Sequence, residues 1–221
     1  MKRLVKTLTA ATLFTLAAQA SAVVLSPSVS APLPGTTVAL NPQLAGTVLE
    51  DTIQAFSFVA NGGTISGTVQ SRVVRSSVDG TLDFYWRVMS DDTSSGPIQS
   101  FRIGNFFTAI YDADWRIDGS GDTAPATGLL FPGSGGYVNY NFDRNGLAAG
   151  HESYFMFLDT SATRYAMTGL YDVTNMGQTE ISQLFATYAP SYVPEPGSAA
   201  LLGLGLAGVL LGRRRKAAAQ D

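Results

Sequence analysis

Cysteine is absent from the 221-residue sequence, and histidine occurs once, as His151. The absence of cysteine excludes thiol catalysis, thiolate metal sites and disulfides, so burial and hydrogen bonding must stabilise the fold. A serine hydrolase triad needs a histidine base, and no Gly-x-Ser-x-Gly motif accompanies His151. We therefore predict that the protein is not an enzyme, and we assign it no catalytic residue and no cofactor.

Positive charge is scarce between residues 23 and 192, where lysine is missing. This stretch has seven arginines and 15 aspartates and glutamates, and 7 minus 15 gives a net charge of −8. Such a domain would repel a nucleic-acid backbone, so we exclude nucleic acid as a partner. The surplus of carboxylates would keep the protein soluble and would attract divalent cations.

Segment 112–122 is the densest acidic cluster, with four aspartates. Calcium takes about six to eight oxygen ligands, which makes a calcium loop one interpretation of the cluster. The segment departs from the EF-hand pattern at Arg116, its fifth position, and at Ile117, where the tight turn needs glycine. We favour a strand that ends at Ile117 and a solvated Asp-Gly turn after it, and we predict no metal site.

Residues 82–89 alternate between apolar and polar side chains, with Trp86 on the apolar face and Tyr85 on the opposite one. Alternation with a period of two predicts a strand with one buried face. The preceding segment 78–81 contains an Asp-Gly pair, which tolerates positive φ at both centres of a tight turn. We therefore predict a hairpin that links this strand to another at 68–77.

Similar alternation predicts most of the remaining chain to be extended. Further strands are expected at 53–60, 64–69, 98–103, 106–117, 137–142, 154–159, 166–173 and 184–188. Residues 23–42 are expected to form an extended lead-in or an edge strand. Short strands at this spacing predict an all-β fold, an antiparallel β-sandwich, with a jelly-roll-like or barrel variant as the alternative.

Aromatic side chains offer a possible sugar-stacking platform of the kind that carbohydrate-binding sandwiches use. The candidates are Tyr85, Trp86, Trp115, Tyr137 and Tyr140. Trp86 is expected in the core, because it shares the apolar face of its strand, whereas Tyr85 is expected to be exposed.

The N-terminus has the pattern of a signal peptide at 1–22. Basic residues at positions 2, 3 and 6 precede an apolar run at 8–18, and Ala20 and Ala22 have the spacing that signal peptidase requires. The apolar run is too short to span a bilayer comfortably, so we predict cleavage by signal peptidase after Ala22.

The C-terminus combines three consecutive elements. These are the motif Pro194, Glu195 and Pro196, the apolar segment 199–212, and the basic cluster Arg213, Arg214, Arg215 and Lys216. The prolines favour an extended linker that an enzyme can reach. As a helix the apolar segment would be about 21 Å long against roughly 30 Å of hydrocarbon, which predicts a marginal single transmembrane helix. The basic cluster is expected to act as a stop-transfer signal and to stay cytoplasmic.

This order of motif, apolar segment and basic cluster resembles the PEP-CTERM sorting signal of Gram-negative bacteria that make extracellular polysaccharide. The resemblance implies that Pro194, Glu195 and Pro196 are recognised by an exosortase, a membrane-embedded transpeptidase-like enzyme. It also implies that the apolar helix anchors the precursor only transiently in the inner membrane. Segments 67–74 and 80–85 resemble anonymous secreted β-domains that accompany the same tail, and that likeness implies no activity.

The expected organisation is therefore a signal peptide at 1–22, an exported β-sandwich domain at 23–192, a sorting signal at 193–216 and a cytoplasmic tail at 217–221. By the resemblance, we expect an exported protein that an exosortase delivers to the cell surface or the exopolysaccharide matrix, with a structural or interaction role. One alternative is a carbohydrate-binding module with exopolysaccharide as its partner. The other is a secreted hydrolase, which would need carboxylates that converge in a cleft.

Overall fold

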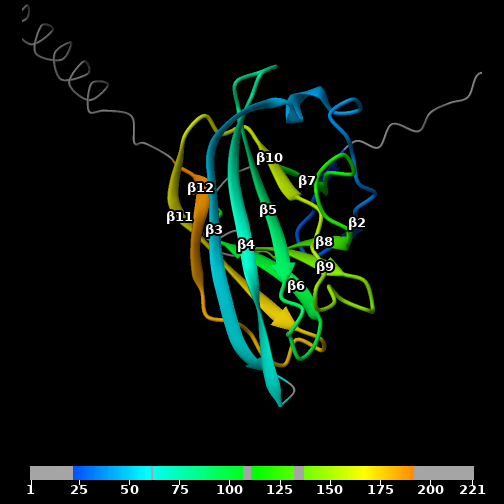
Figure 1. Ribbon diagram of the computed structural model, residues 1–221. Helices are drawn as coiled ribbons and strands as arrows, with labels where there is room; N and C mark the ends of the chain where they lie inside the picture. The colour runs from blue at the N-terminus through cyan, green and yellow to red at the C-terminus, as the bar shows by residue number, and fades with distance from the viewer. Residues whose placement is uncertain (1–21, 61, 107–110, 132–136, 192–221) are drawn as a thin grey trace, which may run out of the picture.

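The computed structural model describes residues 22–60, 62–106, 111–131 and 137–191. In this part of the chain, twelve strands form two six-stranded antiparallel sheets, and the one helical element is the 3-10 helix η1 (Pro42–Leu44). The sheets form two layers and do not close into a barrel (Figure 1). The predicted all-β antiparallel sandwich is therefore confirmed.

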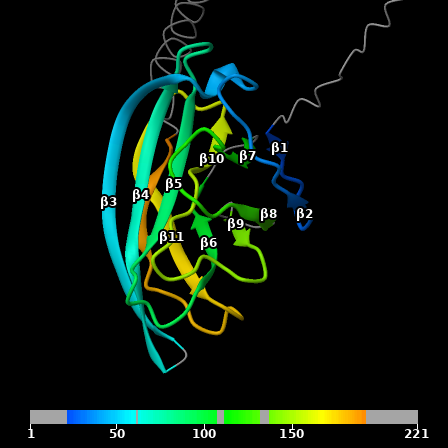
Figure 2. The same ribbon diagram turned by 45° about the vertical axis from the view of Figure 1, so that its right-hand side comes forward.

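Each sheet mixes strands from distant parts of the sequence. The first sheet has the order β1 (Val23–Val24), β7 (Tyr111–Trp115), β10 (Met156–Thr160), β5 (Leu82–Ser90), β4 (Gly63–Ser76) and β3 (Gly46–Ala60). The second has the order β12 (Phe185–Pro190), β11 (Tyr165–Asn175), β6 (Ile98–Gly104), β9 (Tyr137–Phe142), β8 (Pro125–Phe131) and β2 (Ser30–Pro32). Both β1 and β2 are edge strands, as predicted for the lead-in. Figure 2 shows β3 and β4 as the long strands of the first layer.

The core between the sheets is rich in aromatic side chains and centres on Trp86, which is fully buried. Its ring packs against Phe101 and Phe106, with centroid separations of 6.1 and 5.9 Å. The indole Nε1 donates a hydrogen bond to Oγ1 of Thr187 at 2.8 Å. Because a buried indole N–H needs an acceptor, this bond ties β5 to β12 in the opposite sheet. The predicted core position of Trp86 is confirmed.

The predicted hairpin joins β4 to β5, but its turn is longer than expected. The N–H of Ser76 donates to the carbonyl of Thr81 at 2.9 Å, so residues 77–80 form a four-residue loop. Gly80 has the positive φ of 76° that glycine permits, whereas Asp79 does not have a positive φ. Instead, Oδ1 of Asp79 accepts the N–H of Thr81 at 3.0 Å and closes the turn.

Several strand limits differ from the prediction. The strands expected at 64–69 and 68–77 are one continuous strand, β4. The strand expected at 106–117 is shorter, since β7 covers Tyr111–Trp115 and Phe106 packs on Trp86 outside any strand. Strand β8 was not predicted, because its Pro, Thr and Gly residues favour turns; pairing with β9 holds it extended.

The outward face of β5 is covered, which makes the prediction of an exposed Tyr85 wrong. Tyr85 is 3% exposed and packs in a second apolar cluster. The other members of this cluster are Ala22, Leu44, Val74, Phe155 and Phe157. The Tyr85 hydroxyl donates to the carbonyl of Leu44 in η1 at 3.4 Å. Residues about 40 positions earlier in the chain thus cover a face of β5 that the alternation of polar and apolar residues in this strand predicts to be exposed.

Candidate functional site

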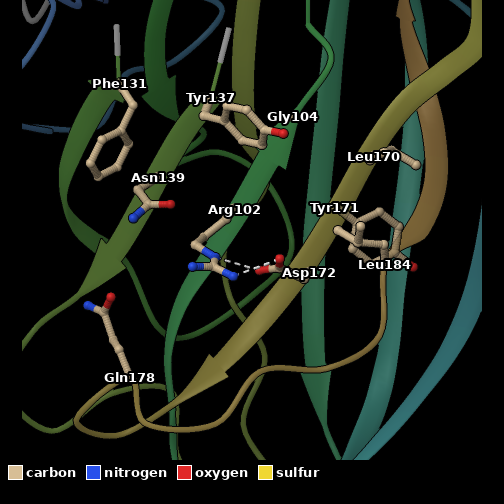
Figure 3. Close-up of a pocket in the computed structure, with 10 residues that line it drawn as sticks. All are labelled: Arg102, Gly104, Phe131, Tyr137, Asn139, Leu170, Tyr171, Asp172, Gln178 and Leu184. Atoms are coloured by element: carbon tan, nitrogen blue, oxygen red, sulfur yellow. Dashed lines mark hydrogen bonds and ion pairs between the residues drawn. The ribbon is translucent and has the colours of Figure 1, made fainter. Parts of the chain in front are cut away.

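The outward face of the second sheet brings polar side chains from three strands together (Figure 3). In the register of the sheet, Asp172 on β11 lies opposite Arg102 on β6, and Arg102 lies opposite Asn139 on β9. The adjacent Ile103 and Val138 are fully buried in the core. Because successive side chains of a strand alternate between its faces, the three polar side chains project outward.

A bidentate ion pair occupies the middle of this face. The guanidinium of Arg102 donates from Nε to Oδ1 of Asp172 at 2.5 Å and from Nη2 to Oδ2 at 2.7 Å. The side chain of Asp172 is 9% exposed and that of Arg102 is 30% exposed. The fork geometry orients both groups. Since the two charges cancel, the face offers fixed donors and acceptors without net charge.

Apolar side chains flank the ion pair and complete a pocket of about 400 Å³, which we call the second-sheet pocket. Tyr137 and Phe131 are cross-strand neighbours and are 49% and 43% exposed. The Tyr137 ring lies against Gly104, where a Cβ atom would meet its Cε1 at 2.3 Å. Glycine at 104 therefore makes room for the ring. Leu184 lines another part of the same pocket.

Tyr171 of β11 borders the second-sheet pocket, but its ring packs in the core between the sheets, against Phe101 and Phe185. The side chain of Tyr171 is 1% exposed, and burial raises the pKa of its hydroxyl well above the usual value. This hydroxyl has no hydrogen-bond partner among the described residues. Leaving a buried hydroxyl unpaired costs about 1–3 kcal/mol.

The predicted sugar-stacking platform does not form. Trp86 and Tyr140 are fully buried and Tyr85 is covered. Trp115 packs against Tyr154 with ring centroids 4.8 Å apart. Of the five candidates, Tyr137 lies in the second-sheet pocket, beside polar residues that sequence reasoning missed.

The missed residues occupy polar positions of strands that were predicted. Arg102, Asn139 and Asp172 fall in the expected strands at 98–103, 137–142 and 166–173. Their alternation with apolar neighbours was the available signal. The order β11-β6-β9, which makes them neighbours, could not be predicted from local pattern.

The four aspartates of segment 112–122 do not converge on one point. Asp114 is fully buried and accepts two backbone N–H groups at 2.8 and 2.9 Å. Asp122 contacts Nδ1 of His151 at 3.1 Å, and both of these side chains are about half exposed. Across the described ranges, no group of three His, Asp or Glu side chains is placed to hold a metal ion. The geometry does not favour the calcium-loop interpretation.

Asp112 lies instead in a row of carboxylates from three neighbouring strands. The register places Asp83 opposite Asp159, and Asp159 opposite Asp112. Asp83 is fully buried, and its oxygens accept no hydrogen bond from the described residues. Burial, and secondly the charge of Asp159, raise the pKa of Asp83 to about 9. Asp83 is therefore a neutral acid at pH 7.

Comparison with known families identifies the C-terminal segment. Residues 193–216 match the PEP-CTERM protein-sorting motif. The chain carries a PEP-CTERM sorting signal. The resemblance noted from the sequence is thus confirmed for these residues. Searches of curated proteins and of solved structures found no match.

The PEP-CTERM sorting signal indicates an exported protein that is targeted to an exosortase and has a membrane-anchored precursor. The predicted recognition residues Pro194, Glu195 and Pro196, and the stop-transfer cluster 213–216, lie outside the described residues. In the described part of the chain, no helix is long and apolar enough to cross a bilayer.

The predicted signal peptide also lies almost entirely outside the described residues, Ala20 included. Ala22 is described and is 7% exposed, in the cluster that contains Tyr85. The next residue, Val23, begins β1 and is paired with Ala113. Cleavage after Ala22 stays a prediction.

Proposed function

We propose that the exported domain is a non-catalytic protein of the cell surface or exopolysaccharide matrix, and that its second-sheet pocket binds neutral saccharide chains. In this proposal the exosortase separates the domain from its inner-membrane anchor, and the pocket then holds it on polysaccharide. The observation that carries the proposal is the placement of the exposed Tyr137 ring beside the Arg102–Asp172 pair in one pocket.

The chemistry of this pocket fits a sugar ring. A pyranose has an apolar C–H face, which can lie on the Tyr137 ring, and a rim of hydroxyls, which both donate and accept hydrogen bonds. Arg102 supplies donors, Asp172 supplies acceptors, and the amide of Asn139 supplies both. The volume of about 400 Å³ lies within the roughly 300–1,000 Å³ range of small-molecule sites.

Neutral saccharides are favoured over acidic ones at this pocket. The ion pair is internally balanced, and the exported domain as a whole has seven arginines against 15 acidic residues. The second-sheet pocket therefore holds no unpaired cation that would favour a polyanion over a neutral chain.

The same geometry argues against hydrolysis at this pocket. Glycoside hydrolysis needs two carboxyl groups on either side of the scissile bond. Asp172 is the one carboxylate among the described residues that line the pocket, and Arg102 holds it in a bidentate pair. A group held in this way is suited to orienting a ligand hydroxyl.

Tyr137→Ala is expected to weaken saccharide binding about tenfold, because it removes the stacking surface and leaves the ion pair in place. A tenfold loss corresponds to about 1.4 kcal/mol. The measurement is retardation of the processed protein in native gels cast with neutral polysaccharides. Tyr137→Phe should keep most of the retardation, because the ring remains.

Ile53→Ala is a suitable control, since Ile53 is 64% exposed on β3 of the other sheet. Its retardation should equal that of the wild type. The proposal is wrong if no neutral polysaccharide retards the wild type, or if Tyr137→Ala and Ile53→Ala migrate alike.

A further inference from the structure

Two arginines of the exported domain, Arg72 and Arg87, pack on the ring of Phe155, and a third, Arg116, lines the same pocket as Arg72 and Phe155. The guanidinium carbons of Arg72 on β4 and Arg87 on β5 lie 4.7 and 5.2 Å from the centre of the Phe155 ring. Arg72, Arg116, Phe155 and Tyr85 line one pocket of about 410 Å³, which we call the arginine pocket. In a domain with a net negative charge, three arginines thus lie near one another, two of them on a single aromatic ring.

Each of these arginines has a carboxylate partner that is more exposed than the arginine itself. The pairs are Arg72–Asp51, Arg87–Glu152 and Arg116–Asp118, at 2.7, 3.2 and 2.6 Å. The arginine side chains are 28%, 17% and 18% exposed, and their partners are 37%, 44% and 35% exposed. Exposed ion pairs of this kind are individually weak. The carboxylates can therefore turn to water, while the guanidinium groups of Arg72 and Arg87 stay on the Phe155 ring.

Two donors of the cluster have no acceptor. The Nε groups of Arg72 and Arg87 are buried and lack a hydrogen-bond partner among the described residues. A buried charged donor without an acceptor is costly. Of these two arginines, Arg72 lines the arginine pocket, so a ligand there meets the guanidinium groups of Arg72 and Arg116.

We infer that the arginine pocket binds the carboxylate of an acidic sugar unit, a uronic acid. A guanidinium fork matches a carboxylate in a bidentate manner, and the volume suits a single sugar ring. On binding, the carboxylate of the ligand takes the place of a carboxylate of the protein at the arginine. We expect Asp118 to be the one displaced, because it lines the pocket. The site lies on the opposite outward face from the second-sheet pocket and does not depend on the function proposed for it.

The test is calorimetric titration of the full chain in detergent with a galacturonic acid oligosaccharide, and with a neutral galactose oligosaccharide of equal length. The acidic ligand should bind, with an affinity that falls as salt rises. Arg116→Gln should weaken this binding about tenfold. Asp118→Asn should strengthen it about threefold or more, because it removes the competing charge.

Asp118→Asn should perturb the fold little. Oδ2 of Asp118 accepts a hydrogen bond from the N–H of Val38 at 2.9 Å, and the amide oxygen of asparagine can accept the same bond. Tyr137→Ala serves as the control on the other face and should leave the affinity for the acidic ligand unchanged. If the second-sheet pocket does not bind neutral saccharides, the binding of the acidic ligand to the arginine pocket is still measured independently.

The inference is overturned if the acidic oligosaccharide binds neither the wild type nor Asp118→Asn. It is equally overturned if Arg116→Gln binds as tightly as the wild type while melting at the same temperature, or if Asp118→Asn gives no gain in affinity.

Discussion

Replacing Pro194, Glu195 and Pro196 with alanine is expected to leave the exported chain uncut and held in the inner membrane. These residues fall in the matched sorting motif at 193–216. An enzyme that recognises the motif needs an extended backbone there, and two prolines impose it. Alanines would remove both the recognised side chains and that constraint, while the apolar segment and the basic cluster would still arrest the chain in the bilayer.

The effect should be close to complete. Fractionation of the host followed by mass measurement should find the wild type shortened and away from the inner membrane, and the triple variant at the length that signal peptidase leaves. Ser191→Ala with Gln220→Ala is a matched control, because both changes lie outside residues 193–216. Unchanged release of the triple variant would contradict the assignment of the motif to processing.

Asp83→Asn is expected to stabilise the domain at neutral pH and to flatten its pH dependence. Asp83 is fully buried opposite Asp159, and its pKa is raised to about 9. In the unfolded chain this carboxyl has its ordinary pKa near 4. Between these values the folded state binds one proton more than the unfolded state, so the free energy of unfolding falls as pH rises.

The magnitude follows from the pH interval. From pH 4 to pH 7 the contribution of Asp83 falls by about 1.4 kcal/mol per unit, or about 4 kcal/mol in all. Asparagine has no charge to lose in either state and can donate to the Asp159 carboxylate at every pH. The variant should therefore gain up to about 4 kcal/mol over the wild type at pH 7, with the difference shrinking toward pH 4.

Urea denaturation of wild type and Asp83→Asn at pH 4, 5.5 and 7 measures this difference directly. Asp79→Asn is the matched control, because hydrogen bonds from Thr81 lower the pKa of this exposed carboxyl. Asp79→Asn should lower the free energy of unfolding at pH 7, whereas Asp83→Asn should raise it. If the free energy of unfolding of the wild type falls no more steeply from pH 4 to pH 7 than that of Asp83→Asn, Asp83 is not protonated in the folded state at pH 7 and the expectation is wrong.

The sandwich could be predicted because its strands obey local rules. Alternation at 82–89 predicts both a strand and the core position of Trp86, and β5 confirms it. The same pattern fails for Tyr85, because the residues around η1 cover its face from about 40 positions away. Local alternation shows which side chains share a face. It carries no information about what packs on that face.

For the candidate site too, local pattern predicts the strands but not which strands become neighbours. Arg102, Asn139 and Asp172 each occupy polar positions of predicted strands, yet their meeting requires β6 to lie between β11 and β9. The carboxylate row of Asp83 and Asp159 depends equally on a pairing of strands far apart in sequence. The acidic composition of segment 112–122 suggested cation binding. The order of the strands, however, places its aspartates next to different neighbours, so they do not converge on one point.

The central claim is that an exported sandwich domain is freed from a C-terminal anchor, and the intact mass of the protein from its native host tests it most directly. We expect a cell-surface or matrix form that begins at Val23 and lacks the apolar segment 199–212 and the basic cluster after it. A surface form whose mass still includes that segment, in a host that has an exosortase, would contradict the account.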